Sequence, residues 1–350
     1  MIESDVNNKK LLLIGSNSVN TYSHYELVRD GFREVRVLFT SRGAYSEKIP
    51  SSEAYVCSVR HPLQIIRFIK AIRRDIRDFN PDIIHIHQLT TPCLYALFAI
   101  RRRVPTIIMA WGSDVLVNPK RSFLLRKMVR YILRHGDYYT ANSQYVASEM
   151  RRIADKELEI PLANLGIELH PQMAEKQNVV FSNRLHNPLY RIDAIISAFA
   201  KFVEHAPDWK LVVAGIGTET EKLKNLVKKL NISDKVDFVG WLDREQNFYY
   251  YSIARIWVSL PESDARPTSL FEAMSMDCIP IVADVPSLHE WIQDGVNGVI
   301  VDDLNQEFIS KAHNIPMEKA IAINREIVEK TATKEINRKK YLQMYERICR

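Results

Sequence analysis

The sequence predicts an α/β protein of two doubly wound domains, each a parallel sheet covered by helices on both faces. Short β-rich runs alternate with amphipathic segments along the chain, and this alternation is interrupted once and then restarts. The interruption lies at 161–176, where Gly166, Pro171 and polar residues break the periodicity. The 350 residues also match the length of about two ordinary domains. We therefore expect domains at 1–170 and 171–330, followed by a C-terminal helix in 331–350.

The first domain contains five apolar runs with the composition of buried strands. They lie at 10–15, 35–39, 81–87, 106–110 and 138–141. Between the second and third runs, isoleucines recur at helical spacing from Ile65 to Ile76. Strands that alternate with helices in this way are typical of a mostly parallel sheet.

The second domain repeats the pattern. Its expected strands lie at 179–181, 211–215, 236–240, 256–260 and 279–283. From Ile192 to Val203 the apolar residues fall on one stripe of a helix with a 3.6-residue period. Ligands of doubly wound sheets bind outside the carboxyl ends of the strands. We therefore expect the functional site at these ends, in the cleft between the two domains.

Composition excludes several classes of protein. With 46% hydrophobic residues, 26% charged residues and only 11 glycines, the chain is not disordered, collagen-like or a coiled-coil rod. No apolar run approaches the roughly 20 residues that a membrane-spanning helix needs. Four scattered cysteines and the absence of a visible signal peptide favour a cytoplasmic protein without disulfides.

The net charge of +6 is concentrated in the first half of the chain. Residues 1–170 contain 25 lysines and arginines against 17 acidic residues, whereas 171–350 contain 23 against 25. A helix expected within 120–135 carries Arg126, Arg130 and Arg134 in one row. Such a basic amphipathic helix suits an anionic membrane surface, which would place the protein peripherally at the inner face of the plasma membrane. The alternative is a solvated basic face, and no motif of a nucleic-acid reader is present.

The densest group of polar residues follows the expected strand at 256–260. Pro267 suits the first position of a helix, so the free amides of Thr268, Ser269 and Leu270 would form an anion site. Asp264 precedes this helix and Glu272 lies one turn into it, where a carboxylate can accept hydrogen bonds from ribose hydroxyls. Alternatively, Asp264 caps the helix and Glu272 is a solvated surface residue.

The stretch from Asp264 to Pro280, with Pro286-Ser287 and 295–301, resembles the C-terminal signature of retaining GT-B glycosyltransferases of family 4, the group 1 glycosyltransferases. Further matches lie at 85–87, 111–114, 164–167, 182–185, 214–217 and 238–240. The family fold has two Rossmann-like domains facing an interdomain cleft, and its last helix commonly crosses back onto the first domain. The chain departs from the family pattern at its N-terminal glycine pair, which is absent and leaves Gly15-Ser16-Asn17, and at four further residues. Asp264 replaces a glutamate, Tyr190 a lysine, Trp111 a histidine and Asp277 a glycine.

The resemblance implies transfer of a sugar from a nucleoside-diphosphate sugar to a glycan or lipid-linked acceptor, in surface polysaccharide biosynthesis. Arg184, beside Tyr190, would pair with the diphosphate together with the amides at 268–270. Glu272 would hold the ribose, Asp264 would contact the donor sugar, and the backbone at Val239, Gly240 and Trp241 would meet the base. Asp264, Glu272 and Asp114 are the expected catalytic residues. The residues expected to bind the acceptor or the transferred sugar are Gly15, Ser16, His87 and Trp111.

The family needs no metal for transfer, and we expect neither a metal site nor a cofactor. The sequence contains no Asp-x-Asp motif at a strand end and no HExxH pattern. His85 and His87 point the same way from one strand and could ligate a metal or bind substrate, although such a pair is more often structural. Two other functions remain open at this point: a nucleotide-sugar epimerase of the same fold, and a non-catalytic nucleotide-sugar-binding partner.

Overall fold

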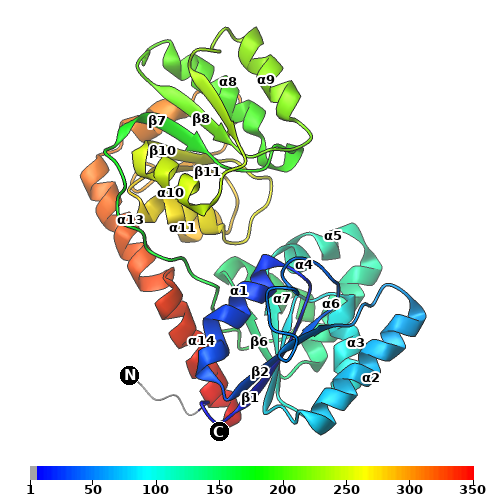
Figure 1. The fold of residues 1–350 in the computed structure, drawn as a ribbon. Helices are drawn as coiled ribbons and strands as arrows, with labels where there is room; N and C mark the ends of the chain where they lie inside the picture. The colour runs from blue at the N-terminus through cyan, green and yellow to red at the C-terminus, as the bar shows by residue number, and fades with distance from the viewer. Residues whose placement is uncertain (1–5) are drawn as a thin grey trace. The chain divides into compact units, whose positions relative to one another are not determined.

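The computed structural model describes residues 6–350, which form two compact units (Figure 1). One unit contains the chain up to Gly166 together with Lys334–Arg350, and the other contains Ile167–Thr333. The boundary between the units thus lies after Gly166, four residues before the boundary expected from the sequence at residue 170. The C-terminal helix α14 (Lys334–Cys349) is part of the first unit.

The first unit is built on a six-stranded parallel sheet with the order β3-β2-β1-β4-β5-β6. Its strands are β1 (Lys10–Gly15), β2 (Glu34–Phe39), β3 (Ala54–Val56), β4 (Ile83–His87), β5 (Thr106–Ala110) and β6 (Tyr138–Ala141). The five expected strands are confirmed, and the short edge strand β3 was not predicted. Since β1 pairs with both β2 and β4, the strand order reverses between β1 and β4. This switch point is where a doubly wound sheet opens a crevice for a ligand.

The helices of the first unit follow the strands in alternation. They are α1 (Val19–Val28), α2 (Pro62–Asp78), α3 (Thr91–Ile100), α4 (Ser113–Leu116), α5 (Asn118–Arg121), α6 (Phe123–His135), α7 (Gln144–Ala154) and α14. Helix α14 runs beside α1 (Figure 1) and places Tyr341 and Tyr345 in the core formed with β1, β2 and β4. The end of the chain therefore completes the core of the first unit.

The basic segment at 120–135 is not one helix. Lys120 and Arg121 end α5, and Ser122 adopts an extended conformation before α6 starts at Phe123. Two arginines of the expected row are also occupied, because Arg130 pairs with Asp155 at 2.8 Å and Arg134 donates to the Ala154 carbonyl at 2.9 Å. Among the described residues, no helix has the length and apolar character needed to cross a membrane.

The second unit contains another six-stranded parallel sheet, with the order β12-β11-β10-β7-β8-β9. Its strands are β7 (Gln177–Ser182), β8 (Lys210–Ala214), β9 (Val236–Gly240), β10 (Ala254–Ser259), β11 (Ile279–Ala283) and β12 (Val299–Val301). Its helices are α8 (Ile192–Val203), α9 (Thr220–Lys229), α10 (Arg244–Ile253), α11 (Thr268–Ser275), α12 (Ile309–His313) and α13 (Met317–Thr331). The five strands expected in this half are confirmed. The switch point here lies between β7 and β10, so the loops after these two strands define the candidate site.

Candidate active site

Arg184 follows β7 and lies at the switch point of the second sheet. Its Nη2 donates to Asp264 Oδ2 at 3.0 Å, and its Nη1 donates to Ser269 Oγ at 2.8 Å. The guanidinium carbon lies 4.4 Å from the ring centre of Tyr190, so the ring that replaces the family's lysine stacks on the arginine. The loop after β7 is thus joined to the loop after β10 and to the start of α11.

Asp264 is a largely buried acid with several partners. Burial raises the pKa of its carboxyl group, while the Arg184 guanidinium acts in the opposite direction. Its Oδ1 accepts from the Ala265 amide at 2.8 Å, and its backbone carbonyl accepts from the Ser287 hydroxyl at 2.6 Å. Ser287 belongs to the Pro-Ser pair of the family signature, so this pair fixes the loop that carries Asp264.

Glu272 lies one turn into α11 and ends a hydrogen-bonded chain that starts in the core. Trp257 Nε1 donates to Asn183 Oδ1 at 2.9 Å, and Asn183 Nδ2 donates to the Tyr251 hydroxyl at 2.7 Å. That hydroxyl donates to Glu272 Oε2 at 3.3 Å. Burial raises the pKa of Glu272, and the bond from Tyr251 acts against that shift. The surface-residue alternative for Glu272 is therefore wrong, because its side chain is half-buried and its carboxylate is held by Tyr251.

A pocket of about 350 Å³ opens above these side chains. Its lining combines four of the expected donor-site residues with polar and aromatic residues from α10 and the loops after β7, β8 and β9: Asn183, Arg184, Leu185, Tyr190, Ala214, Gly215, Trp241, Leu242, Arg244, Asn247, Phe248 and Glu272. Arg184, Tyr190, Trp241 and Glu272 are the predicted members. The pocket has the mixed aromatic and polar character of a small-molecule site.

The floor of the pocket depends on a close approach of two backbones. A Cβ atom on Gly215, which has φ +101°, would lie 2.5 Å from the Arg184 carbonyl oxygen, and one on Gly217 would lie 2.2 Å from that of His186. The Gly215 amide also donates to the Gly240 carbonyl at 2.7 Å. Glycine is required here because any side chain would push the Arg184 loop away from its position.

Two parts of the expected donor site differ in detail. The Leu270 amide donates to the Pro267 carbonyl at 3.2 Å, so it is not free for an anion, whereas Thr268 is exposed at the start of α11. Near the expected base site, Val239 and Gly240 end β9 and do not line the pocket. Of the three residues expected at the base, Trp241 lines the pocket, and it is 69% exposed.

Arg244 and Asn247 were missed from the sequence. Both belong to α10, whose start is marked by the capping box of Asp243 and Gln246. Arg244 pairs with Glu168 at 2.5 Å, which holds its guanidinium at the rim of the pocket. The capping box could have located the helix, but only the pairing of β8 with β9 brings that helix to Arg184.

The residues expected to bind the acceptor lie in the first unit, at the carboxyl ends of β1, β4 and β5. Gly15 ends β1, and the Ser16 hydroxyl lies 3.3 Å from that of Ser18. His87 ends β4, and its ring centre lies 5.6 Å from that of Trp111. The three strands are neighbours in the sheet, so the switch point brings these four residues to one edge.

Asp114 is buried and its carboxylate is fully engaged by the backbone. It accepts from the amides of Leu89 at 2.9 Å, Trp111 at 3.2 Å and Gly112 at 2.8 Å. Burial raises its pKa, and these amides act against the shift. The expected catalytic role of Asp114 stays a prediction, and its contacts give it a positioning role for the loop that carries Trp111.

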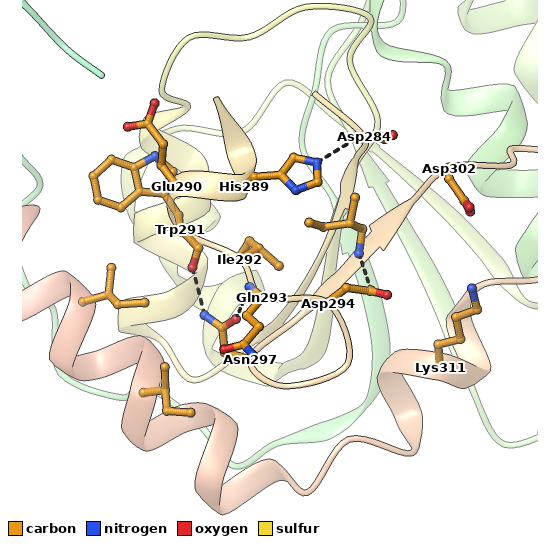
Figure 2. A pocket seen from close by; sticks show the side chains of 13 residues that line it. Asp284, His289, Glu290, Trp291, Ile292, Gln293, Asp294, Asn297, Asp302 and Lys311 are labelled. Atoms are coloured by element: carbon orange, nitrogen blue, oxygen red, sulfur yellow. Dashed lines mark hydrogen bonds and ion pairs between the residues drawn. The ribbon is translucent and has the colours of Figure 1, made fainter. Parts of the chain in front are cut away.

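A larger pocket of about 600 Å³ lies elsewhere in the second unit and contains none of the expected residues (Figure 2). Three aspartates line it, and His289 pairs with Asp284 at 2.7 Å. Asp294 Oδ1 accepts from the Ile300 amide at 2.8 Å. The lining contains four acidic side chains, Glu290 and the three aspartates, which outnumber the basic Lys311 and His289. This pocket therefore does not suit a diphosphate.

Comparison with known proteins places this geometry in a family. The family described as glycosyl transferases group 1 matches residues 170–334, and the family described as glycosyl transferase 4-like matches residues 11–143. Together they cover both units and every expected site residue. The chain is a group 1 glycosyltransferase with the GT-B fold.

Individual relatives of this glycosyltransferase are distant. The N-acetyl-alpha-D-glucosaminyl L-malate synthase of Bacillus anthracis is 25% identical over 64% of this chain, and the match spans 62% of that protein, less than two thirds. The alpha-monoglucosyldiacylglycerol synthase of Acholeplasma laidlawii is 20% identical over 81% of this chain and 79% of its own. Anabaena HepE, solved in complex with UDP, superposes with a TM-score of 0.79 at 14% identity, covering 97% of this chain and 100% of that one. At this identity the likeness establishes the fold.

Proposed function

We propose that this glycosyltransferase moves a sugar from a nucleoside-diphosphate sugar to a glycan or lipid-linked acceptor, with retention of anomeric configuration and without a metal ion. The observation that carries the proposal is the position of Arg184, held by Asp264 and Ser269 at the start of α11 and beside a pocket that ends at Glu272. A guanidinium at a helix N-terminus concentrates positive charge where a diphosphate needs it.

In the proposed reaction the second unit binds the donor. Arg184 and the exposed start of α11 hold the diphosphate and stabilise the negative charge that develops on it as the glycosidic bond opens. The positive charge that a metal ion would supply thus comes from the protein. Glu272, oriented by Tyr251, accepts hydrogen bonds from the ribose, and Asp264 contacts hydroxyls of the donor sugar. The loop at Gly240 and Trp241 lies against the base.

The first unit is assigned to the acceptor, at Gly15, Ser16 and Trp111, with the buried ring of His87 packed against Trp111. Exposed apolar and basic residues at the start of α6, in the same unit, support a lipid-linked acceptor. At the start of α6, Phe123 and Leu124 are 69% and 75% exposed, and the Lys127 ammonium lies 4.6 Å from the ring centre of Phe123. Apolar side chains flanked by basic ones suit the interface of an anionic membrane, and one relative is named for a diacylglycerol product. We therefore place the reaction in the synthesis of surface glycans or glycolipids.

Ligand binding tests the donor site directly. Because one neighbour was solved with UDP, calorimetry with UDP, GDP and their sugars should begin with UDP. We expect one nucleotide to bind the wild type and to raise the Tm, and Glu272→Ala to weaken that binding. If no nucleoside diphosphate or nucleotide sugar binds, the proposal fails. An assay without acceptor separates transfer from epimerisation, since an epimerase forms product from the donor alone.

A further inference from the structure

Three buried histidines meet in the first unit, away from the donor site. His24 belongs to α1, whereas His85 and His87 belong to β4. Their side chains are at most 4% exposed, and one ring nitrogen of each lies within 4.8 Å of the other two. Tyr341 and Tyr345 of α14 enclose the group from the other side, with ring centres 4.5 Å and 6.5 Å from that of His24.

Most of the ring nitrogens in this cluster lack a hydrogen-bond partner. The Tyr345 hydroxyl lies 2.8 Å from His24 Nε2 and 2.7 Å from His85 Nδ1. His24 Nδ1, His85 Nε2 and both nitrogens of His87 have no partner among the described residues. Buried polar atoms without partners are rare and costly, so four of them in one place point to a ligand site.

The three imidazoles are available as ligands. All three rings are buried, an environment that disfavours the charged imidazolium form. A neutral imidazole keeps a lone pair on one ring nitrogen. A single Tyr345 hydroxyl cannot satisfy the three lone pairs, because it carries one proton.

The ring spacing fits a metal ion. With Zn–N distances of about 2.0–2.1 Å and tetrahedral angles, the ring centres of three coordinating imidazoles lie roughly 5 Å apart. The observed separations are 4.7 Å for His24–His85, 4.7 Å for His24–His87 and 5.0 Å for His85–His87. The coordinating nitrogens themselves would be roughly 3.3 Å apart. In the present structure they lie within 4.8 Å of one another.

We propose that His24, His85 and His87 bind one divalent transition-metal ion, with Zn²⁺ as the preferred ion. Neutral imidazoles suit zinc and its neighbours in the first transition row, whereas Mg²⁺ and Ca²⁺ require oxygen ligands. Tyr345 orients two of the three ligands through their second nitrogens, as the outer partners of metal-bound histidines do. The ion fastens α1 and β4 to α14 and is separate from the transfer chemistry assigned to the second unit.

The decisive experiment is a metal titration of the untagged full chain after treatment with a chelator. We expect one equivalent of Co²⁺ to produce the visible absorption of a tetrahedral nitrogen-ligated site, and Zn²⁺ to displace it and to raise the Tm. The absence of a stoichiometric Co²⁺ spectrum, together with a Tm that Zn²⁺ leaves unchanged, would overturn the proposal.

Variants locate the site. His85→Gln should lower the affinity for Zn²⁺ by at least about tenfold, whereas His289→Gln, at an exposed histidine of the second unit, should leave it unchanged. Loss of binding in His289→Gln, or unchanged binding in a folded His85→Gln, would contradict the assignment. Should His85→Gln not fold, Tyr345→Phe keeps the buried ring and removes only the hydroxyl, and a weakening of about 10–100-fold is expected. Unchanged affinity in Tyr345→Phe would then overturn the proposal.

Discussion

At the residue scale, the candidate site is organised by charge compensation around Arg184. Its guanidinium has five N–H donors, of which two are directed to Asp264 and Ser269, so others remain for a diphosphate. The stacking ring of Tyr190 holds the guanidinium plane in place. The same guanidinium favours the charged form of Asp264 and so opposes burial, which raises the pKa of that carboxyl group.

Removal of this guanidinium should reduce transition-state stabilisation. We expect Arg184→Ala to lose at least about 2 kcal/mol in kcat/KM, because a charge-assisted contact to the leaving group is lost. Arg184→Lys should recover part of the loss, since lysine keeps the charge but not the planar fork. Steady-state kinetics with the identified donor would measure both, and an Arg184→Ala variant with wild-type kcat/KM would contradict the assigned role.

The raised pKa of Glu272 predicts a pH dependence of donor binding. Because burial raises this pKa above its ordinary value of 4.5, the carboxylate takes up a proton at a higher pH than an exposed glutamate does. Nucleotide affinity should therefore fall as the pH is lowered toward the raised pKa, and be regained above it. Calorimetry at a series of pH values would measure this. Glu272→Gln cannot ionise, so its profile should be flatter, and identical profiles for both proteins would refute the role.

At the element scale, α14 is the segment that the first unit depends on most. Tyr345 is fully buried, packs edge-to-face on Phe32 with ring centres 5.1 Å apart, and bonds two histidines from its hydroxyl. The Cβ that a side chain at Gly31 would carry lies 2.6 Å from Leu342 Cδ2, so the helix also fits closely against the turn after α1. Helix α14 is therefore part of the hydrophobic core of the first unit.

Truncation of the Tyr345 side chain should strongly destabilise the first unit. We expect Tyr345→Ala to lower the free energy of unfolding of the first unit by about 3–5 kcal/mol, as for other large buried aromatic residues. Lys339→Ala, at an exposed position of the same helix, should change it by less than about 0.5 kcal/mol. Urea denaturation followed by tryptophan fluorescence would compare them. Equal stability of the two variants would mean that α14 is not part of the core.

The strands and most helices could be predicted because buried parallel strands are continuous apolar runs and amphipathic helices have a clear period. The edge strand β3 has three residues and no such run. The break at Ser122 was missed because Lys120 and Arg121 were assigned to the same basic helix as the residues after Ser122. Glu272 was singled out by its position in the expected helix, whereas Arg184 was found through the family resemblance. Tyr251 and His24 could not be found from the sequence, because their contacts exist only once strands far apart in the sequence have paired.

At the scale of the whole molecule, charge is divided between the halves of the chain. The basic excess lies in the first half, which also carries the exposed apolar residues of α6, whereas the near-neutral second half carries the donor pocket. This division fits a protein that takes its donor from solution and its acceptor from an anionic surface.

The start of α6 should determine binding to anionic vesicles. Charge reversal of Arg126 and Lys127 should weaken binding to vesicles of phosphatidylglycerol and phosphatidylcholine by about tenfold or more, because each basic residue contributes about 1 kcal/mol at such a surface. Reversal of Lys228 and Lys229 makes the same change in charge on the second unit and serves as the control. Flotation of the vesicles would compare them, and an equal effect of both pairs would show that only net charge matters.

The most direct test of the central claim is an acceptor-dependent transfer assay in the presence of a chelator. The protein is supplied with a panel of nucleotide sugars and lipid-linked or glycan acceptors, and release of the nucleoside diphosphate is followed together with the anomeric configuration of the product by NMR. We predict acceptor-dependent release from one donor, unaffected by the chelator, a product with the configuration of the donor, and a strong decrease in Glu272→Ala. Absence of acceptor-dependent release from every donor, or a product of inverted configuration, would contradict it.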